Sequence, residues 1–130
     1  MASIFTKIIN GDIPCHKVAE SDTCLAFLDI RPLVEGHTLV VPKVEVDPLF
    51  DLSDEAYQDL FAFAKKVAKG IKASYACDRV GMAVIGLEVA HAHIHLIPIN
   101  AMSDMDFTNP KVQLGHEQLA DSARLINSNL

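Results

Sequence analysis

Residues 91–99, HAHIHLIPI, carry the clearest structural signal in this chain of 130 residues and hold three of its six histidines. Polar rings and apolar side chains alternate from residue 91, which is the two-residue period of a β-strand. On such a strand His91, His93 and His95 point to one face, about 6.6 Å apart. Three imidazoles on one face of a core strand indicate a site that uses them.

Bulk composition narrows the classes of protein that remain. The chain is 50% hydrophobic and 22% charged, as in a folded protein, and its length suits one domain over residues 1–130. A formal charge of -6 argues against nucleic acid as a partner, since sequence-independent binding needs a basic surface. Every apolar run is shorter than the roughly 20 residues that span a bilayer, so we expect no membrane partner.

Cysteine usage and the N-terminal residues bear on the compartment. Cys15, Cys24 and Cys77 are odd in number, widely spaced and without a Cys-x-x-Cys pair, which is typical of reduced thiols. The N-terminal residues lack the apolar core of a signal peptide. We therefore expect a cytoplasmic protein.

Periodicity and turn residues predict an α+β domain. The strongest element is a helix that begins after the N-cap residue Ser53, with acidic residues first, lysines last and an apolar stripe between them. A short helical or irregular opening is expected at Ile4–Asn10, and a short helix is expected around Leu119–Ile126. Short links favour a five-stranded, largely antiparallel sheet with one long and one or two short helices. The predicted strands are Val18–Glu20, Cys24–Ile30, Gly36–Val41, Val80–Ile85 and Ala92–Ile97.

The histidine row has three interpretations from the residues alone. The imidazoles could lie on a solvent-exposed strand face without a task. They could share a zinc ion with His37 as a further ligand, although no clear carboxylate or cysteine partner lies near the run. They could also handle an anion, since neutral imidazoles donate to phosphate oxygens while one unprotonated nitrogen attacks phosphorus without a metal.

Several segments resemble the histidine triad superfamily of nucleotide hydrolases and transferases, in its Hint-like branch. Residues 91–97 are similar to its His-x-His-x-His-x-x signature. The resemblance covers most of residues 4–99 and implies a HIT-like fold. The other similar segments, in the same order and spacing, are IFTKII at 4–9, DIP at 12–14, LAFLDI at 25–30, Pro32 and GHTLVVPK at 36–43.

The resemblance implies a role for each matching position. His93 matches the nucleophile that takes the nucleotidyl group, and His91 and His95 match its flanking partners. His37 matches a fourth histidine at the phosphate, and Asp29 matches the carboxylate that receives the ribose hydroxyls. The apolar slot around the base would be formed by Phe5, Ile8, Phe27 and Ile30.

Ordinary structural roles stay open for some of these residues. Asp29 could cap a strand end, and His37 could be a turn residue after Gly36. The four apolar residues could be plain core. Because the family is typically homodimeric, with two sheets joined into one, a second copy of the chain is an implied partner.

Two departures from the family pattern affect the expected chemistry. Many Hint-like proteins place Gly-Gln and then Ser or Thr ahead of the triad, whereas Leu87 and Glu88 stand there in this chain, followed by Val89 on the leaving-group side. An ionised carboxylate repels phosphate, so Glu88 either points away or acts protonated on an amine leaving group. Zinc-carrying members have two cysteines and a histidine at the positions of Ser3, Thr6 and Glu45, so we predict neither structural zinc nor a cofactor.

The resemblance implies a metal-independent hydrolase with a purine nucleotide substrate. It would cleave the α-phosphate linkage of nucleoside 5'-phosphoramidates or related conjugates through a covalent nucleotidyl-histidine and release AMP or GMP. The alternatives are a dinucleoside polyphosphate hydrolase and a nucleotide-binding module with weak or vestigial catalysis, which Leu87 and Glu88 motivate. The C-terminal extension, about 102–130, either completes the pocket of a partner or covers the sheet.

Overall fold

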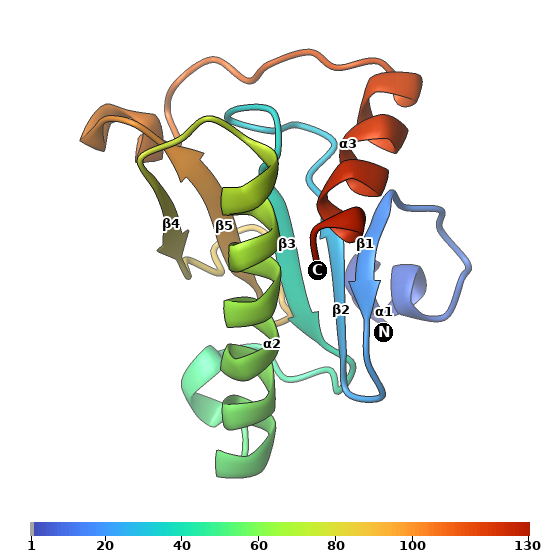
Figure 1. Ribbon diagram of the computed structural model, residues 1–130. Coiled ribbons are helices and arrows are strands. Elements are labelled where there is room, and N and C mark those ends of the chain that lie inside the picture. Colours follow the sequence, from blue (N-terminus) through green and yellow to red (C-terminus); the bar gives the residue numbers. More distant parts are fainter. Residues whose placement is uncertain (1) are drawn as a thin grey trace.

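A five-stranded antiparallel sheet forms the centre of the computed structural model, which describes residues 2–130 (Figure 1). The strands lie in the order β1-β2-β3-β5-β4, and every neighbouring pair is antiparallel. The predicted α+β class and antiparallel sheet are therefore confirmed. The strands are β1 (Lys17–Glu20), β2 (Cys24–Leu28), β3 (Thr38–Pro42), β4 (Arg79–Ala83) and β5 (Ile94–Ile99).

One face of the sheet is covered by the long helix α2 (Asp54–Ser74) and by α3 (His116–Ser128) (Figure 1). The Ser53 hydroxyl accepts the Ala56 N–H at 3.1 Å, which confirms the predicted N-cap. Leu60 and Ile71 on α2 and Ile126 on α3 are fully buried in the same cluster as the sheet residues. Each such side chain contributes about 1.5–3 kcal/mol through its burial, so this face holds the main core.

The opposite face carries a smaller apolar cluster under the short helix α1 (Ile4–Ile9). Strand alternation places Phe27 of β2 and Leu39 of β3 on this face, where Phe5 of α1 packs against them. The Ser3 hydroxyl caps α1 by accepting the Thr6 N–H at 3.0 Å. The candidate site lies on this face, beside α1.

The start of β5 differs from the predicted strand. β5 begins at Ile94, so His91 and His93 precede it, and the strand continues to Ile99. In the register of β3 with β5, Ala92 would face Pro42, which has no N–H to donate. The Pro42 carbonyl accepts from Nε2 of His91, and the Ala92 N–H donates to the Val46 carbonyl at 2.7 Å. Side-chain alternation nevertheless persists, because Ala92 and Ile94 are buried in the main core.

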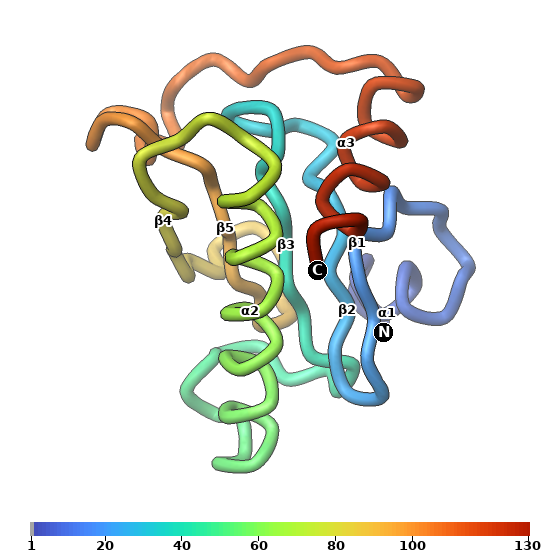
Figure 2. The backbone as a smooth tube through the Cα atoms, in the orientation of Figure 1, coloured from blue at the N-terminus to red at the C-terminus, as the bar shows by residue number. Residues whose placement is uncertain are grey.

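The chain after β5 crosses one end of the sheet before it enters α3 (Figure 2). The crossing begins with the 3-10 turn η2 (Met102–Met105) and is held by the Val112 N–H, which donates to the Pro32 carbonyl at 2.9 Å. A second 3-10 turn, η1 (Leu49–Asp51), precedes α2. Over residues 2–130, every helix is too short or too polar to cross a bilayer.

Candidate active site

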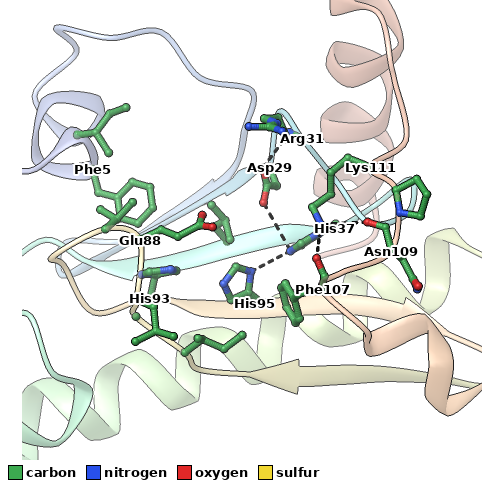
Figure 3. A pocket seen from close by; sticks show the side chains of 17 residues that line it. Phe5, Asp29, Arg31, His37, Glu88, His93, His95, Phe107, Asn109 and Lys111 are labelled. Carbon is green, nitrogen blue, oxygen red and sulfur yellow. Dashed lines mark hydrogen bonds and ion pairs between the residues drawn. The ribbon is translucent and has the colours of Figure 1, made fainter.

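The candidate site is a cavity of about 740 Å³ on the α1 face of the sheet (Figure 3). Its walls come from α1, from the residue after β2, from the start of β3, from β5 and the loop before it, and from the C-terminal crossing segment. Seven of the residues predicted from the sequence meet in this one cavity. They are Phe5, Asp29, His37, Glu88, Val89, His93 and His95.

The protonation pattern of His93 follows from a single hydrogen bond. Its Nδ1 lies 2.7 Å from the backbone carbonyl of His91, and a carbonyl can only accept. The proton of the neutral ring is therefore on Nδ1, and Nε2 keeps its lone pair. The Phe5 ring packs edge-on against the imidazole, with 5.0 Å between the ring centres. The neutral His93 ring thus lines the cavity with its lone pair on Nε2.

His37 and His95 form a directed hydrogen-bonded pair. The Leu33 N–H donates to Nδ1 of His37 at 3.1 Å, so the proton of that ring is on Nε2. Nε2 of His37 then donates to Nδ1 of His95 at 3.0 Å, which leaves an N–H on Nε2 of His95. Burial lowers the pKa of His37 to about 3 and that of His95 to about 4, so both rings are neutral near pH 7.

His91 lies beneath the cavity and is fully buried. Its Nε2 donates to the Pro42 carbonyl at 2.8 Å, and its Nδ1 is 2.8 Å from the Ser3 hydroxyl. The ring is absent from the cavity lining, and its link to His93 is the backbone carbonyl described above. The structure therefore places His91 behind His93, to which it is joined through that carbonyl.

Asp29 follows the end of β2 and faces the histidine pair (Figure 3). Its Oδ1 accepts the Arg31 N–H at 2.9 Å, and its Oδ2 is 3.7 Å from Nε2 of His37. Burial raises the pKa of Asp29, and the nearby Lys111 ammonium opposes that rise. A carboxylate in this position can accept hydrogen bonds from the hydroxyl groups of a ligand in the cavity.

Asp29, His37 and His95 also have the composition of a metal site, with one ligand atom from each within 4.8 Å of the others. The hydrogen bonds do not suit a divalent ion there. Because the Leu33 N–H occupies Nδ1 of His37, a metal at Nε2 would require an imidazolate or an unpartnered buried N–H. The hydrogen bonds from Leu33 to His37 and from His37 to His95 therefore fit neutral imidazoles better than ligands of a divalent ion.

The four apolar residues predicted to surround a base do not all reach the cavity. Phe5 lines it, while Phe27 and Ile8 lie in the cluster behind Phe5, with 5.6 Å between the two phenyl ring centres. Ile30 is 69% exposed and borders a separate depression with Arg31. Their predicted role as the apolar slot around a base stays a prediction, and of the four only Phe5 is among the residues that line the cavity.

The C-terminal crossing segment supplies one wall that sequence reasoning missed. Phe107 packs edge-on against His95, with 4.9 Å between ring centres, and the backbone carbonyls of Phe107 and Asn109 accept from the Lys111 ammonium at 2.6 and 3.2 Å. All three residues and Pro110 line the cavity. These residues carry no periodic or motif signal. Long-range contacts bring them to the site, among them the Val112 N–H bond to the Pro32 carbonyl and the packing of Phe107 on His95.

Comparisons with known proteins agree with this geometry. A family model described as the HIT domain matches residues 10–102. The chain is 43% identical over 99 residues to adenosine 5'-monophosphoramidase hnt1 of Schizosaccharomyces pombe, which covers 75% of this chain and 74% of that protein.

Solved structures show the same likeness over nearly the whole chain. A Hit-like protein from Bartonella henselae has a TM-score of 0.86 at 30% identity, covering 98% of this chain and 96% of that one. A Zn-bound histidine triad family protein from Mycobacterium smegmatis has a TM-score of 0.81 at 27% identity, covering 99% and 93%. These structural matches extend beyond residue 102, where the family model ends.

Proposed function

Since the chain belongs to the HIT domain family, we propose that it is a nucleotide hydrolase acting on nucleoside 5'-phosphoramidates or related nucleotide conjugates. It cleaves the bond between the α-phosphorus and the leaving group and releases AMP or GMP. The relative from S. pombe is an adenosine 5'-monophosphoramidase, which supports this substrate class. The observation that carries the proposal is the hydrogen bond from Nδ1 of His93 to the His91 carbonyl, because it leaves Nε2 unprotonated at the cavity.

The proposed reaction has two steps. Nε2 of His93 attacks the α-phosphorus, a phosphorus–nitrogen bond forms, and the bond to the leaving amine breaks as the amine takes up a proton. Water then opens the nucleotidyl-histidine, which gives the nucleoside monophosphate and restores His93. The N–H on Nε2 of His95 supplies a donor for the phosphoryl oxygens in both steps. Most of the acceleration is assigned to positioning and to this charge stabilisation.

The nucleotide is placed along the cavity by the residues around His93. The ribose hydroxyls donate to Asp29, the base lies against Phe5, and the leaving group lies toward Glu88 and Val89. Glu88 faces the same cavity as His93, on the side proposed for the leaving group. This placement would also accept GMP, since apolar walls discriminate bases by shape.

Replacement of His93 tests the proposal. We expect His93→Ala to abolish hydrolysis of an adenosine 5'-phosphoramidate in a steady-state assay, while AMP still binds because the other walls remain. Turnover in the variant equal to that of the wild type would rule out the mechanism. Addition of a chelator to the wild-type enzyme should leave the rate unchanged, since no step uses a metal.

Two further candidate functions stay open, and the residues ahead of the triad motivate the first of them, a nucleotide-binding module. Glu88 in the cavity and Leu87, which is 89% exposed, stand where a hydroxyl and an amide are usual in Hint-like proteins. A nucleotide-binding module would bind AMP in a titration but form no product from the phosphoramidate. A dinucleoside polyphosphate hydrolase would turn over diadenosine polyphosphates faster than the phosphoramidate.

Assembly and compartment are proposed on separate observations. β4 is an edge strand, and the apolar Met82, Val84 and Ile85 on or next to it are exposed, so a second copy of the chain can pair there to form a homodimer. All three cysteines are free thiols, which suits the cytoplasm. Sedimentation and cell fractionation test these two proposals.

A further inference from the structure

A polar cluster beneath the cavity has no part in the reaction steps above. It consists of Ser3, Thr6, Glu45 and His91, and we refer to it as the Glu45 cluster. Glu45 Oε1 accepts the Ser3 N–H and the Thr6 hydroxyl, each at 2.6 Å. The Ser3 hydroxyl in turn lies 2.8 Å from Nδ1 of His91. The cluster therefore joins the start of α1, the loop after β3 and the segment before β5.

The direction of each hydrogen bond in the cluster can be assigned. Nε2 of His91 donates to the Pro42 carbonyl, so Nδ1 of the neutral ring is an acceptor and takes the Ser3 hydroxyl proton. The Ser3 oxygen accepts the Thr6 N–H, and the Thr6 hydroxyl donates to Glu45. Every donor has an acceptor. This series of hydrogen bonds ends at the Glu45 carboxylate, and the bonds from Ser3 and Thr6 lower the pKa of Glu45.

Two groups that contact the His93 ring are held in place by the Glu45 cluster. The first is the His91 carbonyl, which accepts from Nδ1 of His93 and so determines which nitrogen is free. The second is Phe5, which lies between Ser3 and Thr6 on α1 and packs against the rings of both His91 and His93. If the hydrogen bonds of the Glu45 cluster were lost, the His91 carbonyl and the Phe5 ring would both be held less firmly against His93.

We propose that Ser3, Thr6 and Glu45 are positioning residues that hold Nε2 of His93 in line with the α-phosphorus. The inference rests on the proposed function, in which His93 is the nucleophile. None of the three is among the residues that line the cavity, so they act only through His91 and Phe5. A displacement of about 1 Å at a reacting atom costs about 100-fold in rate, so partial loss of the cluster should lower kcat about tenfold.

Paired substitutions separate positioning from helix capping. Ser3→Gly keeps a good N-cap residue but removes the hydroxyl, whereas Ser3→Thr keeps both. Thr6→Val and Thr6→Ser form a second pair. We expect Ser3→Gly and Thr6→Val to lower kcat about tenfold with KM within about twofold, because the substrate-contacting groups are unchanged. Ser3→Thr and Thr6→Ser should restore kcat.

Glu45→Gln has its own control on α3. It keeps an acceptor oxygen but removes the charge, so we expect a smaller loss of kcat than in Ser3→Gly. Glu117→Gln makes the same chemical change at an exposed residue in the first turn of α3 and should leave kcat and KM as in the wild type.

Ring nitrogen signals provide a readout that does not depend on turnover. In ¹⁵N-histidine spectra we expect His93 to carry its proton on Nδ1 in the wild type, and Ser3→Gly to shift both Nδ1 of His91 and the ring signals of His93. His93 signals unaltered in Ser3→Gly, or a loss of kcat that Ser3→Thr does not restore, would overturn the positioning role. A wild-type protein that hydrolyses no nucleotide, with His93 signals that still respond to Ser3→Gly, would overturn the proposed function and the catalytic positioning with it, and would leave only the structural link from Ser3 to the His93 ring.

Discussion

Acid should destabilise this protein through the buried pair of His37 and His95. Their pKa values of about 3 and about 4 lie below the ordinary value of 6.5 that an unfolded chain would show. The unfolded state then binds protons first, so this part of the stability is full above about pH 6.5 and is lost as the pH falls toward 4. Each histidine loses about 1.4 kcal/mol per pH unit in that window, so the pair costs about 4 kcal/mol at about pH 5.

Urea unfolding of the wild type and of His37→Gln at pH 7.5 and pH 5 measures this contribution. Removal of one of the two titrating rings should reduce the drop in the free energy of unfolding by about 2 kcal/mol, whatever the baseline stability of the variant. His95→Gln should give a similar reduction. If the wild type and His37→Gln lost the same free energy between the two pH values, the neutral, buried state of the pair would be refuted.

Other predictions follow from single contacts. Lys111→Met should raise KM for the phosphoramidate several-fold with little change in kcat, because it removes the ammonium from the cavity wall; an unchanged KM in steady-state kinetics would contradict this. Gly36→Ala should cost about 2–4 kcal/mol of stability in thermal unfolding, because φ is +96° and an added Cβ would lie 2.7 Å from the Tyr75 ring. Gly11→Ala, with φ +84° and open space around it, should cost about 1 kcal/mol. Equal costs for the two variants would count against the Tyr75 contact. Met82→Asp on the exposed edge of β4 should convert the proposed dimer to monomer in sedimentation, and an unchanged mass would exclude this edge as the interface.

Local sequence patterns predict the elements whose structure depends on residues close to one another in the sequence. Ser53 and the apolar stripe after it were sufficient for α2, and Leu119, Ala123 and Ile126 were sufficient for α3. The alternation from His91 to Leu96 predicted which side chains enter the main core. The meeting of His37 with His95 came from the family resemblance, because residues 58 positions apart are brought together only by the pairing of β3 with β5.

Features that depend on distant partners were out of reach of the sequence. The late start of β5 arises from the missing N–H of Pro42 and from the Val46 carbonyl, which takes the Ala92 N–H. The wall formed by Phe107 and Lys111 depends on a backbone contact across the end of the sheet. In the sequence, residues 3, 6 and 45 differ from the ligands of zinc-carrying family members and give no sign of contact, whereas in the structure they hydrogen-bond to one another and to His91.

The most direct test of the account is to trap the covalent nucleotide on the protein. The wild-type enzyme is mixed with an adenosine 5'-phosphoramidate, quenched within one turnover under conditions that preserve phosphorus–nitrogen bonds, and analysed by peptide mass spectrometry. The account predicts an adenylate on His93 that forms and decays at the rate of turnover and is absent from His93→Ala. Turnover without any adduct, or an adenylate on a different residue, would contradict it.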